Sequence, residues 1–269
     1  MKVSDGPVGT VITVRESCVA YVELHNPRRR NAITREMFVL LEQQLRDVIA
    51  AEDVNVIVIH SDGPAFCSGL DLTDLSAQRE RGDAIEDLNR ILDTSASVCG
   101  LIAESRKPVI VAAQGASVGI GALIFLACDL GFMAVDARLL LPKAQLGAGY
   151  FGPVLSRLLG PRRAKSLLLK PGTFVISADD AYQWGLAVAL HPPESLHEEV
   201  RTYAAALAAR PAGWLQLQKA GADHPSAALS IRDAIRAGAH LDAIAHSSRF
   251  AMEAQPALPS HRETDERAR

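Results

Sequence analysis

Two short segments rich in glycine and small residues each follow directly on an apolar stretch. Residues 65–71 (AFCSGLD) come after the apolar run 56–59, and residues 114–121 (QGASVGIG) come after the run 108–113. Small side chains leave backbone N–H groups uncovered, and the first turn of a helix has N–H groups without an intrahelical acceptor. Such groups can bind an anion or an oxyanion that develops during a reaction.

The second segment allows several interpretations besides close packing of a helix against a strand. Gly115, Gly119 and Gly121, with Asp136 further along, resemble the dinucleotide-binding fingerprint of short-chain dehydrogenases. Two observations count against it. The motif comes far into the chain, and none of the four tyrosines is followed by the lysine four positions later that the catalytic pair of those enzymes requires.

A different interpretation makes Ser117 a nucleophile, because residues 115–119 match the G-x-S-x-G pattern of a strand-to-helix elbow. Such a serine needs an acid and a histidine downstream, and the candidates are Asp180, Asp223, His224 and His240. A third interpretation takes both segments together as an oxyanion hole, with one N–H group from each directed at the same carbonyl oxygen. For the first segment, the plain alternative is a tight connection that ends with Asp71 as a helix cap.

At these residues the sequence resembles the crotonase, or enoyl-CoA hydratase/isomerase, superfamily. The resemblance runs in order from Val11 to Leu190 through matching motifs at Asn26–Pro27, 31–34, 65–71, 107–110, 115–129, 146–147, 176–178, Ala181 and 185–186. It implies that the N–H groups of Leu70 and Ile120 form the oxyanion hole for an acyl-CoA thioester. It also implies that coenzyme A enters only as part of the substrate, and we expect no other cofactor.

The resemblance further implies that two stretches of chain lie along the coenzyme A moiety. The implied substrate-binding residues are Arg28, Arg30, Ala32, Leu70, Asp71, Leu72, Thr73 and Ile120. Arg29 lies between two of them, and the three adjacent arginines could contact phosphate groups. A solvated loop is the alternative for such a charge run.

The chain departs from the hydratases of this family at both catalytic positions, so it resembles a divergent member of the family. Those enzymes hold water between two glutamates, where this sequence has Leu123 and Lys143. Simple hydration is not expected, nor is isomerisation that relies on the second glutamate. An enolate could still form by decarboxylation, carbon–carbon cleavage or proton abstraction, with Lys143 as proton donor, or as base if burial lowers its pKa.

Three alternatives remain open at this point. Lys143 could be a surface lysine, and Asp74 and Tyr150 could lie near the cleft whichever way Lys143 points. The chain could bind acyl-CoA without catalysis, or it could be a serine hydrolase that uses Ser117.

The composition is that of an ordinary globular protein. The chain has 269 residues, of which 48% are hydrophobic and 22% charged, and its net charge is −3. No field of one sign favours nucleic acid as a partner. Four cysteines without C-x-x-C spacing favour a reducing, cytoplasmic location. No zinc motif appears, since Arg201 breaks the pattern after His197, and we expect no metal.

The hydrophobic patterning predicts an α/β fold. Residues 109–128 approach the length of a membrane span but contain three glycines, which favour a buried strand followed by a buried helix. The expected strands are 9–14, 18–24, 56–59, 108–113, 130–135 and 139–141, with a turn at 15–17. The expected helices are one capped by Thr34 with Met37, Leu41, Leu45 and Val48 buried, then 73–105, 119–127, one from Ser177 to Trp184, 194–210, 214–222 and 227–246. Beyond about residue 175 no strand is expected.

The resemblance makes this α/β fold a crotonase-like spiral of ββα units with a helical C-terminal region. We expect the spiral core at residues 1–200, a helical trimerisation region at 201–254 and a mobile tail at 255–269, which carries Pro256 and Pro259 and lacks apolar periodicity. The implied partner of the chain is an acyl-CoA thioester, the implied assembly a homotrimer or hexamer, and no contact with a membrane is expected.

Overall fold

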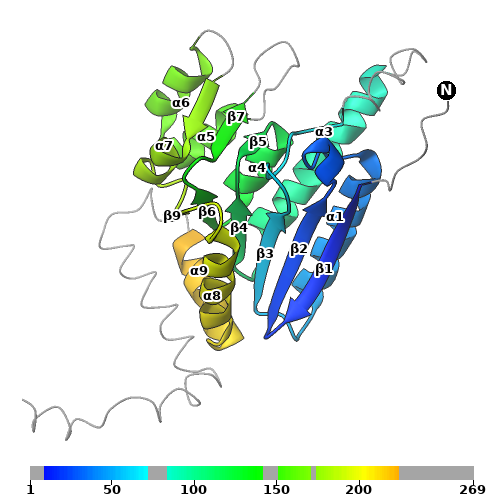
Figure 1. Ribbon diagram of the computed structural model, residues 1–269, viewed down its shortest axis with the longest axis vertical. Coiled ribbons are helices and arrows are strands. Elements are labelled where there is room, and N and C mark those ends of the chain that lie inside the picture. Colours follow the sequence, from blue (N-terminus) through cyan, green and yellow to red (C-terminus); the bar gives the residue numbers. More distant parts are fainter. Residues whose placement is uncertain (1–8, 72–83, 142–150, 171–173, 224–269) are drawn as a thin grey trace, which may run out of the picture. The chain divides into compact units, whose positions relative to one another are not determined.

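The computed structural model describes residues 9–71, 84–141, 151–170 and 174–223 (Figure 1). The chain divides into two compact units, Met1–Ala209 and Arg210–Arg269. Within the described part of the second unit lies one helix, α9 (Ala212–Asp223). All the elements described next belong to the first unit.

A six-stranded sheet forms the centre of this unit. Its strands, in spatial order, are β1 (Thr10–Glu16), β2 (Val19–His25), β3 (Val56–Ser61), β4 (Val109–Ala113), β6 (Leu130–Ala134) and β9 (Ala189–His191). β1 and β2 pair antiparallel, and every later pair is parallel. β3 and β4 are almost wholly buried, as their continuous apolar runs predict for parallel strands covered on both faces.

The hairpin between β1 and β2 turns later than predicted. β1 continues through Glu16, and the turn consists of Ser17 and Cys18, whose φ angles are 50° and 63°. Two central residues with positive φ match the right-handed twist of the flanking strands, whereas the expected turn at 15–17 would end β1 early.

A second sheet contains three strands, β5 (Ala116–Val118), β7 (Arg138–Leu141) and β8 (Phe174–Ser177). β5 and β7 are parallel, while β7 and β8 are antiparallel. Two expectations are corrected here. Residues 116–118 form a strand, and strands continue beyond residue 175 as β8 and β9. The four-residue β7 was predicted at 139–141, but β5, β8 and β9 contain too few alternations to reveal a period of two.

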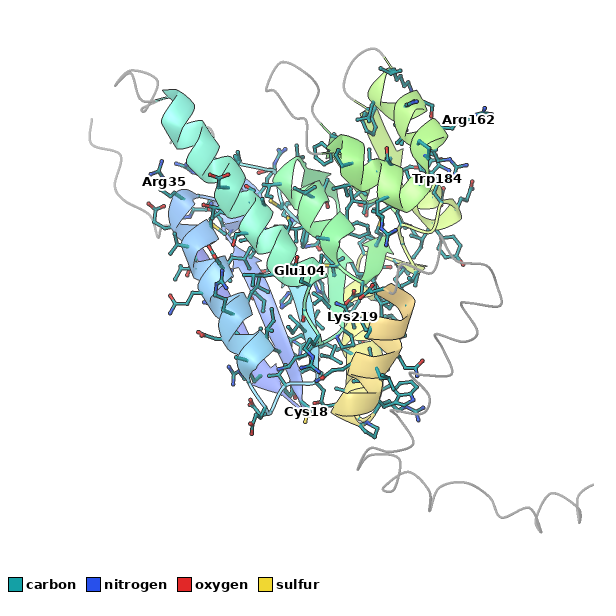
Figure 2. All side chains as sticks on the ribbon, turned by 180° about the vertical axis from the view of Figure 1, so that it is seen from behind. Cys18, Arg35, Glu104, Arg162, Trp184 and Lys219 are labelled. Carbon is teal, nitrogen blue, oxygen red and sulfur yellow. The ribbon has the colours of Figure 1, made fainter. Side chains whose placement is uncertain are left out.

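Helices cover both faces of the large sheet. On one face, α1 (Arg35–Ala50) and α3 (Ala84–Ala103) pack side by side, as Figure 2 shows from behind in blue and cyan. On the other face, α8 (Leu196–Ala208) contacts several strands of the sheet. Thr34 caps α1 by accepting the Met37 N–H at 3.2 Å, and all four residues predicted to be buried on α1 are buried.

The remaining helices are short. They are η1 (Pro27–Arg29), α4 (Ile120–Ala127), α5 (Phe151–Leu159), α6 (Pro161–Leu168) and α7 (Ala178–Gln183). Ser177 caps α7 by accepting the Asp180 N–H at 3.1 Å, as its spacing predicts. The apolar stretch 109–128 divides into β4, β5 and α4, which confirms the buried strand and helix. No helix in the described part of the chain is long and apolar enough to cross a membrane.

Candidate active site

The two glycine-containing segments lie side by side. A parallel bridge joins Cys67 to Ser117, with the Cys67 N–H donating to the Ala116 carbonyl at 3.2 Å and the Val118 N–H donating to the Cys67 carbonyl at 2.8 Å. The Phe66 N–H donates to the Gln114 carbonyl at 2.8 Å. The chain therefore brings together two segments whose similarity in sequence suggested one shared site.

In the first segment, the Leu70 N–H points away from Ile33, its partner in an isolated parallel bridge. The Ile33 N–H donates to the Gly69 carbonyl at 2.8 Å, and the Asp71 N–H donates to the Ile33 carbonyl at 3.0 Å. In such a parallel bridge the residue between these two partners directs its own N–H and C=O to the opposite side. Gly69 has a φ of +99°, which side chains disfavour, and it sets the orientation of the peptide that ends in the Leu70 N–H.

In the second segment, Ile120 is the first residue of α4. It follows Gly119, whose φ is +55° and whose own N–H donates to the Leu140 carbonyl at 2.9 Å. The first backbone bond within α4 runs from the Leu123 N–H to the Gly119 carbonyl at 3.0 Å. The Ile120 N–H thus belongs to the helix turn that has no intrahelical acceptor, where the helix dipole is positive.

Gly121 sets how closely the segments approach. A β-carbon at this position would lie 2.6 Å from the Cys67 β-carbon and 2.8 Å from the Cys67 carbonyl oxygen. Real β-carbons do not approach so closely, so any side chain here would push α4 away from residues 65–71. Close contact of the two segments therefore depends on glycine at this position.

The loop that carries the arginines is connected to the first segment. Arg28 and Arg30 are exposed, whereas Ala32 is buried. The Arg29 guanidinium pairs with the buried Asp71 carboxylate, and the Ser68 N–H donates to the Arg30 carbonyl at 3.0 Å. These contacts hold the arginine loop next to the predicted donor at Leu70.

The other predicted residues fall into two groups. Leu123 lies in α4 and is buried. The residue one helical turn after Ile120 therefore has an apolar side chain. The remaining ones, Leu72, Thr73, Asp74, Lys143 and Tyr150, lie outside the described residues.

Ser117 does not have the geometry of a nucleophile elbow. It lies inside β5 and is fully buried, and its hydroxyl has no hydrogen-bond partner among the residues that the structure describes. A nucleophile elbow requires the serine in the turn between strand and helix, with its oxygen accessible to substrate. Gly115 precedes β5, so the three glycines do not share one turn either, which removes the basis of the dinucleotide interpretation.

A second polar region, which the sequence analysis did not identify, lies on the α8 face of the large sheet. It is a pocket of 210 Å³ that includes Tyr21, Glu23, His60, His197 and Arg201. The two imidazole rings lie edge to face at 5.6 Å, and the Arg201 guanidinium lies 4.7 Å from the centre of the Tyr21 ring. The signal that could have revealed this pocket is His60, which directly follows the apolar run 56–59 in β3.

Burial dominates the electrostatics of this pocket. The pKa of His60 is lowered to about 4, chiefly by burial; His197, when protonated, and Arg201 act in the same direction, whereas Glu23 and Asp62 oppose them. Burial also lowers the pKa of His197. Both imidazoles are therefore neutral near pH 7.

With this geometry in view, comparisons identify the class of protein. The chain belongs to the enoyl-CoA hydratase/isomerase family, whose family model matches residues 14–255. The fold is the crotonase fold: an enoyl-CoA hydratase of Mycobacterium smegmatis superposes with a TM-score of 0.77 at 25% identity, over 92% of this chain and 95% of that one.

Related sequences bear names for more than one reaction. The chain is 29% identical over 222 residues to a crotonyl-CoA hydratase of Syntrophomonas wolfei, a match that covers 79% of this chain and 81% of that protein. It is 30% identical over 181 residues to a peroxisomal Delta(3,5)-Delta(2,4)-dienoyl-CoA isomerase of Arabidopsis thaliana, a match that covers 64% of each chain. Membership of the family therefore defines a class of substrate chemistry but leaves the individual reaction open.

Proposed function

We propose that this protein is an enzyme that binds an acyl-CoA thioester and stabilises its enolate through the N–H groups of Leu70 and Ile120. One observation supports this most directly: two peptides, each preceded by a glycine with positive φ, lie in adjacent segments, and the Leu70 N–H points away from its bridge partner Ile33 while the Ile120 N–H lies in the first turn of α4, which has no intrahelical acceptor. Each donor of such an oxyanion hole is worth roughly 3 to 4 kcal/mol of the activation barrier.

The reaction proposed is one other than simple hydration of an enoyl-CoA. At the positions where hydratases of the family carry glutamates, this chain has Lys143 and Leu123, of which Leu123 is buried. An apolar side chain one turn beyond the oxyanion donor does not orient or deprotonate water. Decarboxylation, carbon–carbon cleavage or proton abstraction would each generate the enolate, with Lys143 as the proton donor or base.

The coenzyme A moiety is proposed to lie along the arginine loop and the residues that follow Leu70. Arg28 and Arg30, which are exposed, would contact phosphate groups, while Ala32, Asp71, Leu72 and Thr73 would line the path of the chain. The ion pair between Arg29 and Asp71 supports this arrangement, because it joins the two stretches. No further cofactor is proposed.

The cellular setting and assembly are part of the same proposal. The protein would act in fatty acid metabolism in the cytoplasm, as a homotrimer or hexamer assembled through residues 201–254. Size-exclusion chromatography with light scattering, on the full chain and on a chain ending at residue 209, which keeps α8 whole, would test the role of the residues beyond it.

The decisive experiment is calorimetric titration with a panel of acyl-CoAs, short and long, saturated and unsaturated, followed by mass spectrometry of each mixture. We expect binding together with a change in one acyl group. Binding without a change across the panel would favour a non-catalytic acyl-CoA binding protein, the alternative that the two replaced glutamates support. Absence of binding would contradict the assignment to acyl-CoA.

A further inference from the structure

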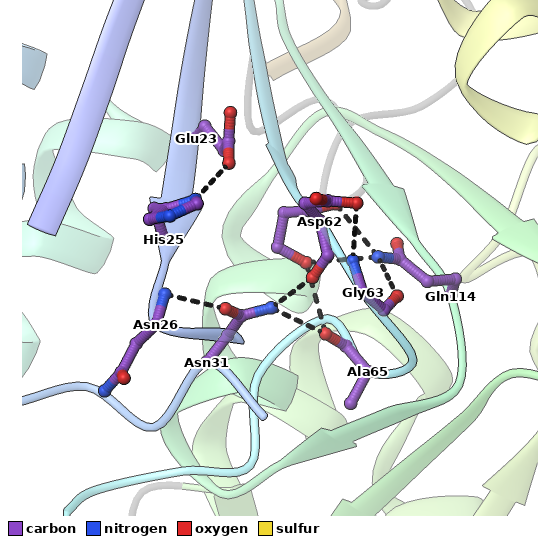
Figure 3. A network of polar contacts seen from close by, with 9 residues as sticks. Glu23, His25, Asn26, Asn31, Asp62, Gly63, Ala65 and Gln114 are labelled. Atoms are coloured by element: carbon purple, nitrogen blue, oxygen red, sulfur yellow. Dashed lines mark hydrogen bonds and ion pairs between the residues drawn. The ribbon is translucent and has the colours of Figure 1, made fainter. Parts of the chain in front are cut away.

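Two buried carboxamide side chains converge on a single turn beside the proposed oxyanion hole. The turn spans residues 61–65, between the end of β3 and the Cys67 bridge (Figure 3). The Asn31 Nδ2 donates to two of its carbonyl oxygens at 2.7 and 2.9 Å, and the Gln114 Nε2 donates to two others at 2.9 and 3.1 Å. The four acceptors are the carbonyls of Asp62 and Ala65 for Asn31, and of Ser61 and Gly63 for Gln114.

Gln114 belongs to the segment that carries Ile120, whereas Asn31 lies in the arginine loop beside the segment that carries Leu70. Asn31 lies two residues before Ile33, which bridges to Leu70, and Gln114 lies six residues before Ile120. The clamped turn runs directly into residues 65–71. The two side chains therefore connect the Leu70 segment, the turn and the Ile120 segment.

Asn31 is itself fixed in position. It is only 1% exposed, and its Oδ1 accepts the Asn26 N–H at 2.8 Å. Its φ of +56° is a conformation that asparagine tolerates better than most residues. The donor group of Asn31 is thus held rigidly against the turn.

Burial of the Gln114 side chain has a free-energy cost that packing alone does not explain. Its Oε1 is buried and has no hydrogen-bond partner among the described residues, while its Nε2 is fully used. A buried unpaired acceptor destabilises a protein. The side chain therefore contributes chiefly as a donor to the turn, since an apolar residue of the same shape would avoid that cost.

We propose that Asn31 and Gln114 are positioning residues that set the separation and direction of the Leu70 and Ile120 N–H groups. This inference rests on the proposed function, because it concerns the geometry of the same oxyanion hole. Hydrogen-bond donors stabilise a developing oxyanion only when they are held in place before the reaction. Two carboxamides that anchor four carbonyls of one turn supply that rigidity, because they fasten the turn to the start of each segment.

The test uses two variants, each with a matched control from a distant part of the fold. Asn31→Asp places a carboxylate oxygen against two carbonyls, and Asn55→Asp makes the same change where the side chain donates to the Ala208 carbonyl at 2.9 Å. Gln114→Met removes the donor without adding charge, and Gln44→Met does so where the side chain donates to the Val11 carbonyl at 2.8 Å. If Asn31→Asp fails to fold, the Gln114→Met pair still decides the question.

The first measurement is hydrogen exchange of the unliganded full-length protein. We expect exchange about tenfold faster in peptides covering 65–71 and 114–121 for Asn31→Asp and Gln114→Met, which corresponds to about 1.4 kcal/mol of local stability, with no change in those peptides in the controls. Faster exchange confined to the turn, with both segments unchanged, would overturn the inference. This measurement needs no ligand, so it is independent of the proposed function.

The second measurement is the 13C chemical shift of butanoyl-CoA labelled at the thioester carbonyl. In the wild-type complex the shift should move downfield, and both site variants should bind with that displacement at least halved, whereas the controls retain it. Equal displacement in wild type and site variants would overturn the inference. No displacement in a wild-type complex would instead contradict the proposed function, and hydrogen exchange would then decide the positioning role alone.

Discussion

The two glycine-containing segments, 65–71 and 114–121, form the paired segments of the proposed site. They present polar groups in the opposite way to the pocket beside α8. At the paired segments the available donors belong to the backbone, and the side chains of Cys67 and Ser117 are fully buried. Burial raises the pKa of the Cys67 thiol to about 12, so it stays neutral. In the pocket, by contrast, imidazole, guanidinium and carboxylate side chains converge from β2, β3 and α8.

This difference shows why perturbed titratable groups are an incomplete guide to function. His60 has a strongly lowered pKa, yet it lies outside the region that the proposed chemistry uses. The proposed donors at Leu70 and Ile120 have no titratable atom. A site built from peptide groups is found through chain geometry, and its sensitivity to mutation should follow packing more than side-chain chemistry.

The largest effect is expected from Gly121→Ala, which tests the packing of the paired segments. The new β-carbon would lie 2.6 Å from the Cys67 β-carbon, so we expect a loss of about 3 kcal/mol in the free energy of unfolding, together with loss of acyl-CoA turnover. Urea denaturation measures the loss in the free energy of unfolding. Gly100→Ala is the control: nothing lies within 4 Å of its β-carbon, and it should stabilise α3 by about 0.5 to 1 kcal/mol. Equal stability of the two variants would contradict the argument.

The next effect concerns the pocket, where side-chain charge should control stability. The unfolded chain takes up a proton on His60 near pH 6.5, but the folded chain does so only near pH 4. The free energy of unfolding should therefore fall with decreasing pH, by about 2 kcal/mol from this group between about pH 6.5 and 4.5. His60→Gln should remove that part of the pH dependence, as urea denaturation across the range would show. A variant with the wild-type slope would exclude His60 as its source.

The smallest effect is expected from Ser117→Ala. The substitution removes a buried hydroxyl that has no partner among the described residues, so stability should change by less than about 1 kcal/mol and acyl-CoA turnover should remain. A complete loss of activity in a folded variant would restore Ser117 as a nucleophile and remove the contrast between the two regions. Circular dichroism and the mass-spectrometric assay supply the two measurements.

Much of the local structure was predictable because it depends on neighbouring residues. The Thr34 cap, the buried stripe of α1 and the apolar strands β3 and β4 follow from side chains within one or two turns or from continuous runs. The short strands β5, β8 and β9 were not predictable, because three or four residues form a strand only when a partner strand is present. The hairpin turn was misplaced for a related reason: its position depends on the register between β1 and β2.

The sequence by itself determined the family and the two segments whose peptide groups are proposed to act, since small residues and glycines at fixed spacing are visible in one dimension. Only the tertiary structure decided what surrounds them. The Cys67–Ser117 bridge, the convergence of Asn31 and Gln114 on one turn, and the contact between His60 and His197 join residues far apart in the chain. Each of these contacts depends on which strands and helices become neighbours, and that arrangement follows from packing of the whole core.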